Sequence, residues 1–219
     1  MIKKLQSLKK KKGFTLVELI VVIAIIGVLA AILVPTMLNY VTSSRVTSAN
    51  STAASIKNNI DAFLTNADTA GYGMKLGGTK QTLTITVSPN GGDAKWDVSA
   101  ATATNFKGSA PGVVWGAAGS AVAATTKTGT VAETLLAVEL RNLFPEIKTA
   151  SIVVGLVGGK CVAVAYTADQ SSAMSAGTDC PAIDSTTGAF SSTFSWDGKT
   201  AGVASSGIIV GTAPAIGMV

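Results

Sequence analysis

The sequence predicts an α+β fold in which one long N-terminal helix packs on an antiparallel β-sheet. Two observations predict this fold. Near the N-terminus, a continuous apolar stretch gives way to apolar residues at steps of three and four, which is the spacing of one helix face. Toward the C-terminus, short β-branched runs are separated by glycine-rich turns, as in hairpins. The 219 residues are enough for one domain or two small ones.

Residues 14–34 predict a helix that spans a membrane. Residues 19–34 contain no polar side chain, and a helix of 21 residues is about 32 Å long, enough for the hydrocarbon core of a bilayer. The lysines before this stretch predict that the N-terminus stays in the cytoplasm and that the rest of the chain lies outside.

Three interpretations of this stretch compete. It could be a secretory signal peptide cut near Ala30, a plain membrane anchor, or a segment with a further role. Glu18 favours the third interpretation, because a charge inside the apolar stretch costs about 2.5–3.5 kcal/mol and serves neither a signal peptide nor an anchor.

Past this stretch the helix should continue on a two-faced pattern. We expect it to cover residues 14–66, with a membrane and assembly half at 14–38 and a half packed on the sheet at 39–66. The apolar face of the second half consists of Val46, Ala49, Ala53, Ile56, Ile60, Phe63, Leu64 and Ala67. The glycines at 71 and 73 should end the helix.

Residues 67–219 should form a β-rich head. The expected strands are 82–88, 151–157, 160–167, 189–196 and 208–210, and one helix is expected at 131–143. Gly158 and Gly159 separate two of these strands and predict a two-residue hairpin turn. Residues 97–130 carry no clear pattern.

Charge and composition argue against several classes of function. Six of the 17 basic residues lie in residues 1–13, and without that tract the chain has 11 basic and 12 acidic residues. No basic patch remains, so we expect no nucleic-acid binding. The chain has no histidine, which excludes Ser-His-Asp and Cys-His catalysis and zinc sites that use histidine. Metals bound by oxygen and enzymes built on Asp, Glu or Lys remain open, but no constellation of such residues supports either, so we expect no enzyme, no cofactor and no metal site.

The motif KKGFTLVELIVVIAIIGVLAAILVP at residues 11–35 closely resembles the N-terminus of bacterial type IV prepilins and of their pseudopilin relatives. The resemblance covers about residues 9–45. It implies that a prepilin peptidase removes residues 1–13 as a leader by cutting the Gly13–Phe14 bond, and that the new amine of Phe14 is methylated. It also implies that Glu18 meets the Phe14 amine of a neighbouring subunit during assembly.

Gly27 and Pro35 should weaken the helix locally. Proline lacks an N–H and clashes with the carbonyl four residues earlier, and glycine costs about 1 kcal/mol relative to alanine. A proline at this position is common in pilins. A simple kink where the helix leaves the membrane and a functional melting of the helix both remain open.

Cys161 and Cys180 are the only cysteines. An even pair in an exported head predicts a disulfide, which would add about 3 kcal/mol by closing a loop of about 20 residues. The resemblance agrees, because many pilins fix a C-terminal loop in this way. The alternative is two free, buried thiols.

The resemblance implies a structural subunit that polymerises with other pilin subunits into a surface fibre for adhesion, motility or DNA uptake. Its partners would be the prepilin peptidase, a platform protein and an assembly ATPase. The subunit would be a single-pass membrane protein before assembly and part of the cell-surface pilus afterwards, where the fibre could meet a solid surface or a polysaccharide. One alternative is a pseudopilin of a type II secretion or competence system. A more remote one is a membrane-anchored carbohydrate-binding protein that uses Trp96, Trp115 and Trp196, although scattered tryptophans are more often core residues.

Overall fold

The computed structural model describes residues 14–69, 81–91, 93–99, 136–169, 172–184, 187–191, 194–196 and 200–216. The expectations for residues 1–13 (with Gly13), 71–73 and 131–135 and for Trp115 lie outside the described residues. The chain divides into two compact units, Met1–Ser43 and Ser44–Val219.

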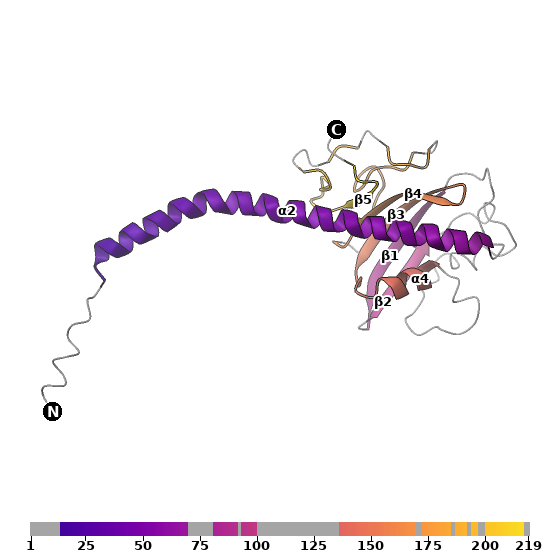
Figure 1. Cartoon of the computed structure of the whole chain (residues 1–219), viewed down its shortest axis with the longest axis horizontal. Helices are drawn as coiled ribbons and strands as arrows, with labels where there is room; N and C mark the ends of the chain where they lie inside the picture. The colour runs from indigo at the N-terminus through magenta and orange to yellow at the C-terminus, as the bar shows by residue number, and fades with distance from the viewer. Residues whose placement is uncertain are drawn as a thin grey trace, which may run out of the picture. The chain divides into compact units, whose positions relative to one another are not determined.

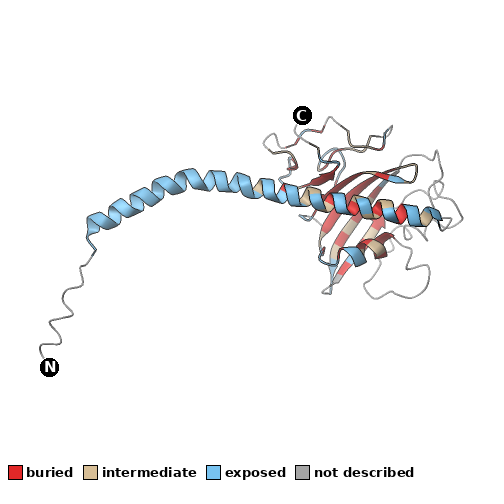
Figure 2. Ribbon diagram, viewed as in Figure 1, coloured by how far each residue is buried: buried red, intermediate tan, exposed pale blue. Residues whose placement is uncertain are grey.

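The N-terminal element is the helix α2, which runs from Leu16 to Thr69 (Figure 1). The sequence prediction of 14–66 therefore places both ends within three residues. The helix is continuous through Gly27 and Pro35. Residues 14–41 are exposed on every side, whereas the part of α2 that belongs to the second unit buries one face (Figure 2).

The second unit is built on a five-stranded sheet in the order β2-β1-β3-β4-β5, in which all neighbours are antiparallel. The strands are β1 (Gln81–Asn90), β2 (Asp93–Ser99), β3 (Ala150–Val157), β4 (Lys160–Thr167) and β5 (Gly211–Ala213). A short helix, α4 (Leu136–Leu143), follows β2 in the chain. Together with α2 this confirms the α+β fold.

The hairpin between β3 and β4 forms as expected. Gly158 and Gly159 have φ angles of 55° and 83°. Both central residues of a type I′ turn need such positive values, and the twist of this turn matches that of the strands it joins. The register of the pair shifts between Gly155 and Leu156, near the turn.

One face of the sheet packs on α2 and α4, and this layer forms the larger core (Figure 2). Six apolar residues of α2 are buried, namely Val46, Ala53, Ile56, Ile60, Phe63 and Leu64, and Ala49 and Ala67 are partly buried. The predicted apolar face of the helix is therefore confirmed. Alternate residues of the strands face it, because side chains of a strand point to opposite sides in turn.

The opposite face of the sheet carries a second, smaller core. Val153 of β3 and Ala165 of β4 pack there against residues from the described parts of 172–216, namely Met174, Cys180, Phe194, Trp196, Ala204 and Val210. Most of this covering chain is irregular, and its backbone contacts include three isolated β-bridges.

Two sequence predictions about the head were wrong in detail, and one strand was missed. The described residues of 189–196 form no strand, and Phe190 makes only an isolated bridge with Ile183. The aromatic side chains of this segment belong to a loop and pack into the second core. The last strand is Gly211–Ala213 instead of 208–210. Strand β2 was not predicted at all.

Candidate functional site

The first unit presents a helix whose large apolar side chains are all solvent-accessible. Phe14 is 79% exposed and Leu16 73%, and every large apolar residue from there to Val41 is at least 45% exposed. An apolar surface of this extent needs lipid or protein to cover it. In the described part of the chain, α2 is the one helix long and apolar enough to cross a membrane, a test that a signal sequence also passes.

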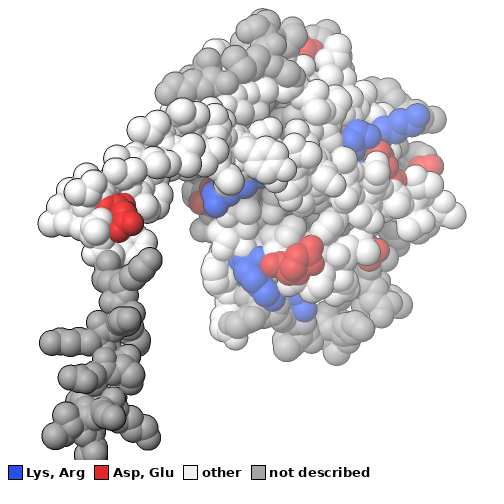
Figure 3. Space-filling view, turned by 60° about the vertical axis from the view of Figure 1, so that its left-hand side comes forward, with Lys and Arg blue, Asp and Glu red and all other residues white. Residues whose placement is uncertain are grey.

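Glu18 interrupts this apolar surface. It is the only charged residue between positions 14 and 44, and Figure 3 shows one acidic group on a helix surface otherwise free of charged side chains. Its carboxylate Oε2 accepts hydrogen bonds from the Thr15 N–H at 2.8 Å and from the Thr15 hydroxyl at 2.7 Å. The Glu18 N–H donates in return to the Thr15 Oγ1 at 3.2 Å.

These three contacts form a capping box. Thr15 precedes the first helical residue, Leu16, and Glu18 occupies the third helical position, so the two side chains satisfy each other's free backbone N–H groups. We did not single out Thr15 from the sequence. The signal was present, because a Thr-x-x-Glu spacing directly before an apolar run is the sequence signature of this cap.

Pro35 lies inside the helix without interrupting it. The Thr36 hydroxyl donates to the Leu33 carbonyl at 2.9 Å and to the Ile32 carbonyl at 3.4 Å, one turn earlier. Gly27 meets open space, because an added Cβ would find no atom within 4 Å. Both residues could still open the helix in another state, and that role stays a prediction.

The expected disulfide between Cys161 and Cys180 is not formed. Both cysteines are free and buried, which is the alternative that the sequence left open. The physical reason is their position: Cys161 belongs to the core between the sheet and α2, whereas Cys180 belongs to the core on the opposite face. Burial, with Asp61 and Asp179 respectively adding a smaller effect, raises the pKa of each thiol to about 12, so both thiols stay protonated and unreactive at neutral pH.

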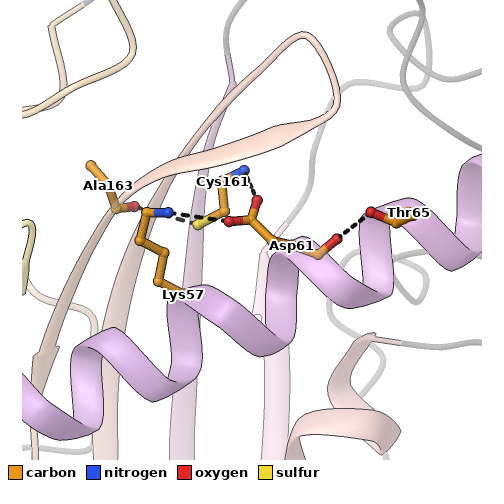
Figure 4. Close-up of polar contacts among 5 residues, drawn as sticks. All are labelled: Lys57, Asp61, Thr65, Cys161 and Ala163. Atoms are coloured by element: carbon orange, nitrogen blue, oxygen red, sulfur yellow. Dashed lines mark hydrogen bonds and ion pairs between the residues drawn. The ribbon is translucent and has the colours of Figure 1, made fainter.

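A polar contact ties α2 to the hairpin near the turn (Figure 4). The Cys161 N–H donates to Asp61 Oδ1 at 2.6 Å, and the Lys57 ammonium pairs with Asp61 Oδ2 at 3.1 Å. Asp61 and Lys57 are one helical turn apart, and their side chains are 35% and 27% exposed. One oxygen of the Asp61 carboxylate therefore binds the backbone of β4, and the other pairs with Lys57 of α2.

Substitution of Asp61 by Ala is expected to lower the free energy of unfolding of the head by about 2 kcal/mol, because it removes a charge-assisted bond to a backbone N–H. The matched variant Lys57→Met, which removes only a partly buried pair one turn apart within the helix, should cost about 0.5 kcal/mol or less. Denaturant unfolding of a chain that begins at residue 39 measures both. Equal losses for the two variants would contradict this account of Asp61.

The tryptophans do not form a surface platform in the described residues. Trp96 is fully buried and Trp196 is 4% exposed. Trp196 packs edge-on against Phe194, with ring centroids 4.9 Å apart. Two of the three tryptophans on which a carbohydrate-binding function would depend are therefore core residues.

Comparison with known proteins points to the same region. The family model for the prokaryotic N-terminal methylation motif matches residues 8–34. Fimbrial protein Q of Moraxella bovis is 39% identical over 85 residues, which is 39% of this chain and 53% of that protein. The type IV major alpha-pilin of Moraxella bovis is 38% identical over 78 residues, which is 36% of this chain and 49% of that protein.

A third relative is the type IV major fimbrial protein FimA of Dichelobacter nodosus, which is 41% identical over 61 residues, 28% of this chain and 39% of that protein. The chain thus spans about half the length of these relatives or less, and no solved structure matches it. The matched motif and the relatives show that the N-terminal region of the chain, with its long apolar helix, is similar to that of type IV pilins.

Proposed function

We propose that the chain is a structural subunit that polymerises into a type IV pilus on the cell surface. The observation that carries the proposal is the exposed apolar half of α2, which has one carboxylate held at its first turn. A membrane can cover such a helix before assembly, and the helices of neighbouring subunits can cover it in a fibre. The β-rich head at 67–219 then forms the outer surface.

Processing is the first step of the proposed function. A prepilin peptidase hydrolyses the Gly13–Phe14 bond: water adds its oxygen to the Gly13 carbonyl carbon, and its proton goes to the new amine of Phe14. That amine then attacks the methyl group of a sulfonium methyl donor, whose S–C bond breaks to leave a thioether, and the amine loses a proton. Removal of residues 1–13 takes away six lysines, which leaves an N-terminus that can move out of the membrane with the helix.

Assembly is the second step. An unpaired carboxylate in the bilayer costs a few kcal/mol. The Phe14 amine of a neighbouring subunit offsets that cost when it pairs with Glu18, so the pair sets the stagger between adjacent helices. A platform protein in the membrane and an assembly ATPase are the partners that would lift each subunit into place. Local opening at Gly27 and Pro35 would let the helices bend as they bundle.

The processing proposal predicts a mature protein that begins with N-methylated Phe14. Intact mass and N-terminal sequencing of membrane and fibre material measure it directly. A chain that begins after Ala30 would restore the signal-peptide interpretation, and an uncut chain would indicate a plain anchor.

Electron microscopy of cells with and without the subunit tests polymerisation. Fibres that disappear with the subunit and contain it support a pilus. A processed subunit in cells that form no such fibre would instead indicate a pseudopilin, which shares this N-terminus.

A further inference from the structure

The start of α2 is fixed from both sides. Thr15 and Glu18 satisfy each other's backbone N–H groups, which opposes fraying toward the C-terminus. On the other side, Gly13 is a poor helix former, and the lysines at 9–12 would meet the positive end of the helix dipole if the helix grew toward them. The helix therefore begins at Leu16, and Phe14 and Thr15 lie outside it.

The surroundings make this cap stronger than one in water. Phe14, Leu16 and Val17 are exposed apolar residues, so the first turn lies in lipid if the proposed function is correct. The apolar side chains around the first turn offer no polar group to replace the Thr15 hydroxyl as the partner of the Glu18 N–H. Loss of the hydroxyl would thus leave the position of the helix start spread over several residues.

We propose that Thr15 is a positioning residue for the processing reaction: its side chain fixes the helix start two residues after the Gly13–Phe14 bond, and so holds the first helical turn at a constant distance from that bond. A helix start that varies by a residue or more would change the distance between the first helical turn and the bond that the peptidase must cut. This inference rests on the proposed function, because it concerns the same bond.

The test compares variants of the full-length precursor in bilayer discs, cut by a prepilin peptidase that processes the wild-type chain. Thr15→Val keeps the shape of the side chain and removes the hydroxyl, so kcat/KM should fall about fivefold or more. Thr15→Ser restores the hydroxyl and should return kcat/KM to within about twofold of wild type. The control is Thr36→Val, which removes a hydroxyl from the same helix near Pro35 and should leave cleavage unchanged.

Hydrogen exchange at the Glu18 amide gives a second readout. This amide should exchange faster in Thr15→Val and should be protected again in Thr15→Ser, because its partner is the Thr15 hydroxyl. Cleavage of Thr15→Val at the wild-type rate, or a failure of Thr15→Ser to rescue it, would overturn the inference while processing itself stands. If no prepilin peptidase cuts the wild-type precursor after Gly13, the proposed function fails and this inference fails with it.

Discussion

Glu18→Gln is expected to leave membrane insertion and cleavage intact and to reduce the number of fibres to few or none. Insertion should be at least as good as in the wild type, because a costly charge is gone from the apolar helix. Cleavage should continue, because a glutamine at this position still completes the capping box with Thr15. Only the attraction between the carboxylate and a neighbour's amine is lost.

The geometry at Glu18 separates its part in the helix cap from its pairing with a neighbour's amine. Its Oε2 atom already accepts two hydrogen bonds from Thr15, and within the described residues no hydrogen bond reaches Oε1. A neighbouring ammonium can therefore pair with the carboxylate while the cap stays formed. Glutamine keeps an acceptor for Thr15 and loses the charge, so the substitution tests the pairing and not the cap.

Fibres are counted by electron microscopy in cells that carry Glu18→Gln as the only subunit, with the amount of processed subunit measured in parallel. Glu146→Gln, which removes an exposed carboxylate from the head, is the matched control and should keep normal fibres. Wild-type fibre numbers in Glu18→Gln would refute the pairing mechanism.

The long helix and the β3–β4 hairpin could be predicted because local sequence determines them. The step of three and four from Val46 to Ala67 reports which face of α2 meets the sheet, and Gly158–Gly159 can form a turn that most other pairs cannot. The capping box could also have been predicted from local sequence, because Thr15 and Glu18 are only three residues apart.

Strand β2 and the second core depend on partners far away in the sequence. β2 contains Asp93, Ala94, Lys95 and Asp97, which have low strand propensity. It forms because β1 pairs with it along its whole length. Phe194 and Trp196 alternate as in a strand, yet they are buried by a loop that covers the sheet. The bond between Asp61 and the Cys161 N–H joins residues 100 positions apart, which no local pattern can report.

Gly211→Ala is expected to destabilise the head strongly for a single added methyl group. Gly211 begins β5, and a Cβ there would collide with the carbonyl carbon and oxygen of Ala49 and with the backbone N of Asn50 in α2. These are helix backbone atoms that cannot rotate away as a side chain can. The next residue also holds β5 close to α2, because the Thr212 N–H donates to the Asn50 side-chain oxygen at 2.7 Å. Either the helix or the strand must move, and the contact between them is lost.

The cost of that movement should be about 3 kcal/mol, at the upper end of overpacking in a core, and should lower Tm by about 6–12 °C in a domain of this size. Gly207→Ala is the matched control: its added Cβ meets open space, and its φ of 83° carries only the ordinary penalty of about 1–2 kcal/mol for a side chain in that region. Thermal unfolding of chains that begin at residue 39, followed by circular dichroism, compares the two. If Gly211→Ala lowers Tm no more than Gly207→Ala does, β5 does not lie against the helix backbone as closely as the structure places it.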